Sequence, residues 1–264
     1  MAPTDHEIAA SLARGAGEVL LAERTAVGQG SFEPAALKDR GDRAAHDYLV
    51  AELARLCPGD AVLSEEGADD KARLEAERVW IVDPLDGTRE FAERADDGEW
   101  RDDWAVHVAL WRRDEGLVAG AVALPAREQV FSTGQLAVSA ARSSSVPLRV
   151  AVSRSRPPAI VEQLASRTEI ELVPMGSAGV KAMSVVTGDA DVYLHGGGQY
   201  EWDSAAPVAV ARAAGLVTTR LDGSALAYNR PDPWLPDLLV CRPDDHASLA
   251  ALIHELHSTA GNDE

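Results

Sequence analysis

Apolar residues recur at helical spacing in two segments near the start of the chain. In residues 7–21 they return every three or four positions, and residues 43–56 repeat the pattern. A stripe with this period covers one face of an α-helix and packs against a core. The pattern therefore predicts two amphipathic helices at the start of the protein.

Short apolar or alternating runs, bounded by turn residues, come next. They lie at residues 61–63, 79–82, 104–111, 117–124 and 129–132. Runs of this length are typical of strands, and the turn-like Arg113-Asp114-Glu115-Gly116 separates two of them. We predict an antiparallel meander here.

The small, polar segment 139–147 contains a proline and indicates a connection between two halves. We divide the chain into an N-terminal α+β half, residues 1–138, and a C-terminal α/β half, residues 139–264. In the second half, strands are predicted at 148–152, 170–174, 191–195, 216–219 and 238–241, and helices near 158–166, 179–187, 204–214 and 246–257.

Charge excludes one class of function. The 264 residues include 25 Lys and Arg against 43 Asp and Glu, which gives a net charge of −18. A protein that binds nucleic-acid polymers normally carries a basic face, so we expect no such partner here. A small anionic substrate fits if a metal supplies positive charge.

We find no apolar run of membrane-spanning length and no secretory signal, and we expect a cytoplasmic protein. Cys57 and Cys241 lie in unrelated contexts and are interpreted as bystander thiols.

The densest candidate chemistry is Asp83-Pro84-Leu85-Asp86-Gly87-Thr88, at the end of a buried-type strand. The strand fixes Asp83 and the proline turns the chain, so that Asp86 faces the same space and both carboxylates can hold hard cations. The N–H group of Gly87 and the hydroxyl of Thr88 can meet a phosphate or a water. The same residues also fit an ordinary Asx-rich turn before a helix.

Two further acid clusters end or begin predicted elements. Ser64-Glu65-Glu66 ends a short strand, although adjacent acids are more often solvated. Glu201-Trp202-Asp203 opens a helix with Asp203 at the expected N-cap, and capping alone would explain it. His107, in an alternating strand, is interpreted as a structural histidine rather than a ligand.

Carboxylates that converge on one pocket repel one another, which raises their pKa values unless cations compensate. Divalent ions would remove that penalty and attract a phosphate dianion. Mg²⁺ suits an all-oxygen site better than zinc, and Mn²⁺ is also compatible.

In this order, Ser64-Glu65-Glu66, Asp83-Pro84-Leu85-Asp86-Gly87-Thr88 and Trp202-Asp203-Ser204-Ala205-Ala206 resemble the motifs of the inositol monophosphatase superfamily. The longer strings that reach Glu90-Phe91 and include Glu201 are more similar to the CysQ branch, the 3′-phosphoadenosine 5′-phosphate phosphatases. Inositol enzymes usually have Ile and Asn at the positions of Leu85 and Glu90. The resemblance covers most of the chain and implies an αβαβα layered sandwich.

The resemblance also implies roles for individual residues. The implied metal ligands are Glu65, Asp83, the Leu85 carbonyl, Asp86 and Asp203, with Asp83 bridging two ions. The implied catalytic residues are Asp42, Glu65 and Thr88, of which Asp42 and Thr88 would orient the attacking water. The implied substrate-binding residues are Asp86, Gly87, Thr88, Arg154, Ser177, Lys181 and Asp203. Family members usually have Thr three residues before the acid at position 42, whereas this chain has Asp39, which puts the role of Asp42 in question.

Ser177 and Lys181 lie in a glycine-rich turn before a predicted helix, which fits either anion binding or a helix start with a solvated lysine. Arg154 would offer a guanidinium group to a second phosphate, although surface arginines are common.

The implied activity is that of a phosphomonoesterase with two or three Mg²⁺ ions. It would convert 3′-phosphoadenosine 5′-phosphate to AMP, would extend to the related sulfate donor, and would serve sulfate assimilation with sensitivity to lithium. Alternatives on the same scaffold are an inositol-1-phosphate or fructose-1,6-bisphosphate phosphatase. A non-catalytic, metal-dependent phosphate-ligand sensor is a third alternative, suggested by Asp39. The family also implies a homodimer.

Overall fold

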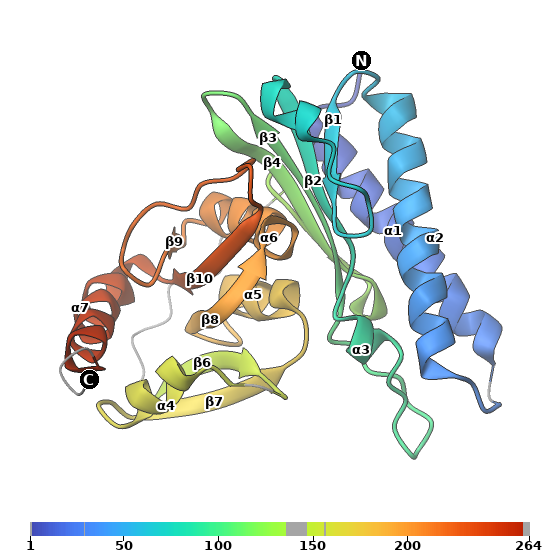
Figure 1. Cartoon of the computed structure of the whole chain (residues 1–264). Coiled ribbons are helices and arrows are strands. Elements are labelled where there is room, and N and C mark those ends of the chain that lie inside the picture. The colour runs from blue at the N-terminus through green and yellow to red at the C-terminus, as the bar shows by residue number, and fades with distance from the viewer. Residues whose placement is uncertain (1, 29, 136–146, 156, 261–264) are drawn as a thin grey trace.

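Two β-sheets and their covering helices form five layers in the order helix, sheet, helix, sheet, helix (Figure 1). The computed structural model describes residues 2–28, 30–135, 147–155 and 157–260. This arrangement confirms the αβαβα sandwich predicted from the sequence motifs.

The first layer consists of α1 (Asp5–Val27) and α2 (Pro34–Leu56), which lie side by side (Figure 1). The Thr4 hydroxyl accepts the Glu7 N–H and caps α1, and Pro34 occupies the first turn of α2. Both helices are longer than the predicted segments 7–21 and 43–56, since α1 continues to Val27 and α2 already begins at Pro34.

The first sheet has the strand order β1-β2-β3-β4-β5. Its strands are β1 (Ala61–Ser64), β2 (Arg78–Asp86), β3 (Ala105–Arg112), β4 (Gly116–Leu124) and β5 (Gln129–Ser132). The antiparallel meander is confirmed for β2 to β5. It is wrong for β1, which runs parallel to β2. The chain between them includes the 3₁₀ helix η1 (Lys71–Glu75) and crosses back along the sheet, as a parallel connection must.

The second sheet has the order β7-β6-β8-β10-β9 and mixed directions. Its strands are β6 (Leu148–Ser153), β7 (Ile170–Met175), β8 (Val192–Tyr200), β9 (Val217–Thr219) and β10 (Trp234–Cys241). The helices of this half are α4 (Ala159–Ala165), α5 (Ala178–Thr187), α6 (Glu201–Ala213) and α7 (Pro243–Ala260). Strands and helices alternate along most of this half, as the α/β pattern predicts.

Apolar side chains fill the spaces between the layers. α1 and α2 pack on one face of the first sheet, and α5 and α6 lie between the two sheets. α4 and α7 cover the outer face of the second sheet. The central layer therefore comes from the second half of the chain and packs against the sheet of the first half, which brings the start of α6 near the end of β2. Within the described residues, no helix combines the length and the apolar composition needed to cross a membrane.

The connection predicted at 139–147 falls mostly on residues 136–146, which lie outside the described residues. A domain boundary between 138 and 139 therefore stays a prediction.

Candidate active site

The parallel pairing of β1 with β2 brings the first acid cluster to the second. Ser64 lies opposite Val82, and the Glu65 N–H donates to the Val82 carbonyl at 3.4 Å. Glu65 therefore lies beside Asp83, where both strands end. Two segments separated by a crossover thus place their acids at one edge of the sheet.

Three aspartates meet at the centre of the site. One carboxylate oxygen from each of Asp83, Asp86 and Asp203 lies within 4.8 Å of the others. Asp83 and Asp86 come from the end of β2, and Asp203 comes from the first turn of α6. An all-oxygen donor set at this spacing fits a hard divalent cation. The sequence therefore predicted correctly that these residues converge.

The local turn after β2 organises the main chain. The Leu85 N–H donates to Asp83 Oδ1 at 3.0 Å, and the Thr88 hydroxyl donates to the Leu85 carbonyl at 3.2 Å. Gly87 follows with φ of 88°, in the left-handed region, and starts the short helix α3 (Thr88–Phe91). The Asx turn and the acid site are thus the same structure.

Asp203 lies one turn further into its helix than predicted. Tyr200 is the N-cap, and Asp203 Oδ2 accepts the Tyr200 N–H at 2.6 Å from the third helical position. The N-cap prediction is therefore wrong by three residues. Glu201, which is fully buried, fixes the helix start because its carboxylate accepts the N–H groups of Asn229 and Arg230 at 2.7 and 2.8 Å.

A clamp from the second half of the chain holds Asp86. Its Oδ2 accepts the Ser177 hydroxyl at 2.5 Å and the Gly179 N–H at 2.7 Å. Nε2 of the buried His107 lies 3.2 Å from the same oxygen, and His107 Nδ1 lies 3.1 Å from the Trp202 carbonyl. Three neighbours therefore hold Oδ2 in place, and the ring of His107 helps to position a carboxylate.

The surroundings of Asp86 keep it ionised. Burial by itself would raise its pKa, but the nearby charges of His107 and Lys181, with the hydrogen bond from the Gly179 N–H, outweigh burial and lower the pKa to about 2. Burial alone would lower the pKa of His107, but the carboxylate of Asp86 raises it. The two groups therefore stabilise each other's charged forms.

The other acids have pKa values shifted upward. Loss of solvent and nearby negative charge raise the pKa of Glu65 to about 7 and that of Asp203 to about 7. Burial and the charges of Glu65 and Asp86 raise the pKa of Asp83 well above its usual range. A group of acids held in this state favours a bound cation, because positive charge replaces the protons.

Asp42 on α2 lies near this cluster. Burial, followed by the charges of Glu66 and Asp39, raises its pKa to about 7. Asp39, the residue that departs from the family pattern, thus adds negative charge beside Asp42. A carboxyl with a pKa near neutrality can accept or release a proton at physiological pH.

A cavity of about 640 Å³ lies between two of these aspartates and residues of the second sheet. Asp86, Ser177, Lys181 and Asp203 line it. Lys181 is 7% exposed and donates from Nζ to the Ser177 carbonyl at 2.6 Å, and burial lowers its pKa. Among the described residues that line the cavity, Lys181 has the only Lys or Arg side chain. Lys181 can therefore supply positive charge close to Asp86.

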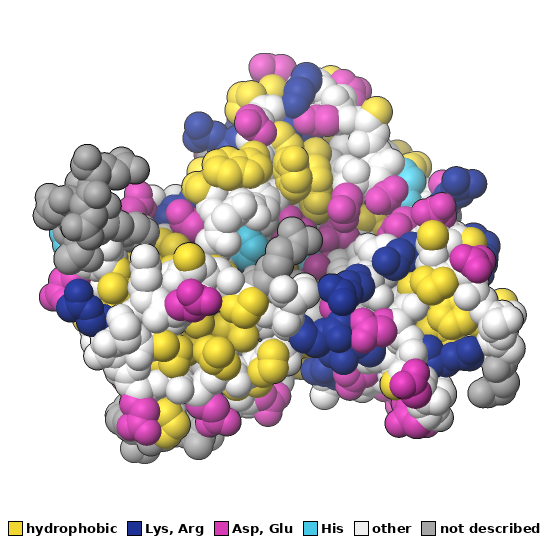
Figure 2. Space-filling model, turned by 60° about the horizontal axis from the view of Figure 1, so that its bottom comes forward, with side chains coloured by type: hydrophobic (Ala, Val, Ile, Leu, Met, Phe, Trp, Pro, Cys, Tyr) yellow, Lys and Arg dark blue, Asp and Glu magenta, His cyan; other side chains and the backbone are white. Residues whose placement is uncertain are grey.

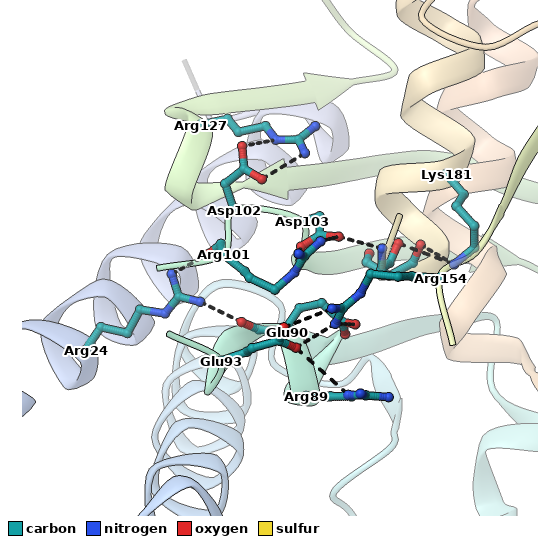
Figure 3. Close-up of polar contacts among 12 residues, drawn as sticks. Arg24, Arg89, Glu90, Glu93, Arg101, Asp102, Asp103, Arg127, Arg154 and Lys181 are labelled. Carbon is teal, nitrogen blue, oxygen red and sulfur yellow. Dashed lines mark hydrogen bonds and ion pairs between the residues drawn. The ribbon is translucent and has the colours of Figure 1, made fainter. Parts of the chain in front are cut away.

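Arg154 has a different environment from Lys181. Its guanidinium pairs with Glu93 at 2.5 Å and with Glu90 at 2.9 Å, and Figure 3 shows it pointing at these two acids. Next to this pair, Arg101 holds Asp103, whose Oδ2 accepts the Gly176 N–H at 2.6 Å. Figure 2 shows basic side chains gathered with acidic ones on one part of the surface, despite the net charge of −18. Arg154 therefore links the end of β6 to Glu90 and Glu93, in and just after α3. Its predicted contact with a phosphate stays untested.

Sequence reasoning missed two contacts of Asp86, with His107 and with the Gly179 N–H. The available signal was the meander itself, because pairing of β2 with β3 places His107 opposite Asp83. The glycine-rich turn before α5 was predicted to offer N–H groups to an anion, and the anion that the Gly179 N–H binds is the Asp86 carboxylate. A Cβ there would lie 2.2 Å from His107 Nε2, so the helix approaches the ring closely only with glycine.

The fold and the acid cluster define a class of proteins. Residues 4–258 match the model of the inositol monophosphatase family. The chain belongs to this family.

Particular relatives are more informative about the branch. The chain is 51% identical over 263 residues to a 3′-phosphoadenosine 5′-phosphate phosphatase of Mycobacterium leprae, which covers 96% of this chain and 94% of the relative. It is 32% identical over 206 residues to the 3′(2′),5′-bisphosphate nucleotidase CysQ of Escherichia coli K12, over 74% of this chain and 80% of the relative.

Solved structures agree on the fold. CysQ from Bacteroides thetaiotaomicron superimposes with a TM-score of 0.71 at 27% identity, over 89% of this chain and 96% of that chain. Inositol monophosphatase II from Staphylococcus aureus gives a TM-score of 0.76 at 20% identity, over 92% of each chain.

Proposed function

We propose that this chain hydrolyses the 3′-phosphate ester of 3′-phosphoadenosine 5′-phosphate to AMP and inorganic phosphate, with Mg²⁺ as cofactor. The observation that carries the proposal is the convergence of Asp83, Asp86 and Asp203, of which Asp86 and Asp203 line a cavity large enough for a nucleotide. The phosphatase of M. leprae, at 51% identity over nearly the whole chain, supports this substrate rather than a sugar phosphate.

The acid cluster would hold the cations. Glu65, Asp83, Asp86 and Asp203, with the Leu85 carbonyl, would be the ligands, and a bound Mg²⁺ would supply Lewis acidity that activates water and stabilises the leaving oxygen. The Ser177 hydroxyl and the Gly179 N–H fix the direction of the Asp86 carboxylate. The ion therefore meets a preorganised site.

The remaining residues would handle the phosphate and the water. Because the Thr88 hydroxyl gives its hydrogen to the Leu85 carbonyl, its oxygen can accept a hydrogen bond from the attacking water. Asp42, with a pKa of about 7, is suited to take up the proton of that water. The N–H groups of Gly87 and Thr88 would hold the phosphate oxygens. The water oxygen would bond to phosphorus as the ester bond breaks, and the 3′-oxygen would take a proton from solvent and leave as a hydroxyl, while Asp42 returns the proton it took up to solvent.

The experiment is a comparison of phosphate release from three substrates. Purified protein is given 3′-phosphoadenosine 5′-phosphate, inositol 1-phosphate or fructose 1,6-bisphosphate, each with Mg²⁺, Mn²⁺ or a chelator. The proposal expects the highest kcat/KM with the nucleotide, and loss of release with the chelator. A preference for inositol phosphate or the sugar bisphosphate would contradict the substrate but leave the metal site standing. Nucleotide binding without any release would favour a sensor.

A further inference from the structure

Two exposed aromatic side chains share the cavity with the acid cluster. Among the described residues, large hydrophobic side chains are exposed at four positions, namely Val50, Leu172, Tyr200 and Trp234. Tyr200 and Trp234 are 45% and 48% exposed, and both line the cavity that Asp86 and Asp203 also line. Exposed aromatic rings in the wall of a cavity indicate that a ligand packs against them.

The two rings come from directly paired positions. Tyr200, at the end of β8, and Trp234, at the start of β10, are cross-strand partners. Side chains at paired positions project from the same face of a sheet with their Cβ atoms about 5 Å apart. Tyr200 and Trp234 are therefore neighbours on one wall of the cavity.

Neighbouring residues hold both rings in place. The Tyr200 ring stacks on Trp202 at 4.7 Å between centroids, with 11° between the planes. The Trp234 indole lies over Gly198, where a Cβ would be 2.7 Å from Nε1. Gly198 has φ of 91°, so glycine is favoured there for its backbone as well as for this contact. The aromatic wall is thus preorganised.

The wall is also close to the predicted metal site. The Tyr200 N–H donates to Asp203 Oδ2, so Tyr200 is one hydrogen bond away from the acid cluster. A ligand that places a phosphate ester at the acids would share the cavity with these rings. Its far end needs a flat, apolar face to use them.

We infer that Tyr200 and Trp234 form the nucleobase subsite, on which the adenine ring stacks. This inference rests on the proposed function, because it names the part of the cavity that recognises the base. Every nucleobase has a π face that an aromatic side chain can stack on, whereas inositol and fructose phosphates have none. The pair therefore favours nucleotides over the other phosphate esters.

The test compares Tyr200→Ala and Trp234→Ala with wild type on 3′-phosphoadenosine 5′-phosphate. We expect KM to rise about 5- to 150-fold in each variant, the range for removing one base-stacking contact. We expect a much smaller change in kcat, because the rings do not touch the ester. Trp234→Phe should retain most of the affinity. Hydrolysis of glycerol 2-phosphate, which has no ring, should fall far less than hydrolysis of the nucleotide.

Leu172→Ala is the matched control, because Leu172 is 48% exposed and belongs to β7 of the same sheet but does not line the cavity. It should leave KM unchanged. A second readout needs no turnover: AMP added to the wild-type protein should quench tryptophan fluorescence, and the quenching should be lost in Trp234→Phe.

The outcomes separate this inference from the proposed function. If wild type prefers the nucleotide but both alanine variants keep its KM and its response to AMP, the subsite is wrong and the proposed function stands. If wild type prefers inositol phosphate, the proposed function is wrong. If Trp234→Ala changes the oligomeric mass and leaves KM unaltered, the rings contact another copy of the chain, which also overturns the subsite.

Discussion

Asp86 illustrates how much of a metal site depends on single hydrogen bonds. Its Oδ2 accepts from Ser177 and Gly179 and lies 3.2 Å from His107 Nε2, so one oxygen is used to fix the orientation of the other. Partners of this kind commonly change metal affinity when they are removed. Ser177, which the sequence placed among the substrate-binding residues, is therefore also suited to position a ligand.

Ser177→Ala should raise the Mg²⁺ concentration needed for half-maximal activity by about 10- to 100-fold, because Asp86 loses a donor that orients it. The measurement is phosphate release against Mg²⁺ at saturating substrate. Ser184→Ala is the matched control, because it also removes a serine hydroxyl, but one that donates to the Lys181 carbonyl instead of to Asp86. It should leave the Mg²⁺ dependence unchanged. If only the KM for the nucleotide changed, Ser177 would be a substrate ligand instead.

At the scale of elements, the short helix α3 connects the metal turn to the second sheet. Glu90 and Glu93 from this region pair with Arg154, which directly follows β6, and Figure 3 shows these contacts side by side. A Cβ on Gly176 would lie 2.4 Å from Glu90 Cγ, so the turn before α5 packs closely against the same acid. The network therefore keeps the turn that carries Ser177 close to β2.

Arg154→Ala should lower the free energy of unfolding by about 1–2 kcal/mol. The loss is smaller than for a fully buried ion pair, because the Arg154 side chain is 28% exposed. It is not zero, because the variant leaves the nearly buried Glu90 carboxylate without its cation. Thermal unfolding and the KM for the nucleotide are measured together. Arg167→Ala, at an exposed position on the same half, should change neither. A large rise in KM with unchanged stability would show instead that Arg154 binds the second phosphate.

At the scale of the whole molecule, folding brings acids from both halves together in a chain with a net charge of −18. Asp42, Glu65 and Asp203 each have a pKa of about 7, above the ordinary values of 3.8 and 4.5. A carboxyl with a raised pKa in the folded state favours folding while it is protonated. This contribution is present below the unfolded-state pKa and is lost as pH rises through about 7.

In a chelator, we therefore expect Tm to fall as pH rises from about 5 to 8, and added Mg²⁺ to raise Tm more at pH 8 than at pH 5. Scanning calorimetry at the two pH values measures both effects. Asp203→Asn should flatten the dependence, whereas Glu171→Gln, which removes one exposed charge from β7, should not. A Tm that is independent of pH in the chelator would contradict the raised pKa values.

The sequence by itself determined where the helices and strands lie and which acidic residues are candidates for the site. Apolar spacing located nearly every strand and helix, and the turn Asp83-Pro84-Leu85-Asp86-Gly87-Thr88 is local, because its hydrogen bonds join residues two or three positions apart. Glu65 and Asp203 were identified from their motifs and from their places at the ends of elements. Helix ends were predicted less accurately, since α1 continues to Val27 and α2 already begins at Pro34.

Only the tertiary structure decided which residues meet. Ser177 and Asp86 are 91 positions apart, and Arg154 and Glu93 are 61 apart. The parallel direction of β1 came from a crossover that apolar spacing does not encode. Whether a serine, arginine or tryptophan faces a ligand, another side chain or solvent depends on free energies gained when distant segments pack, and a linear pattern carries no record of that packing.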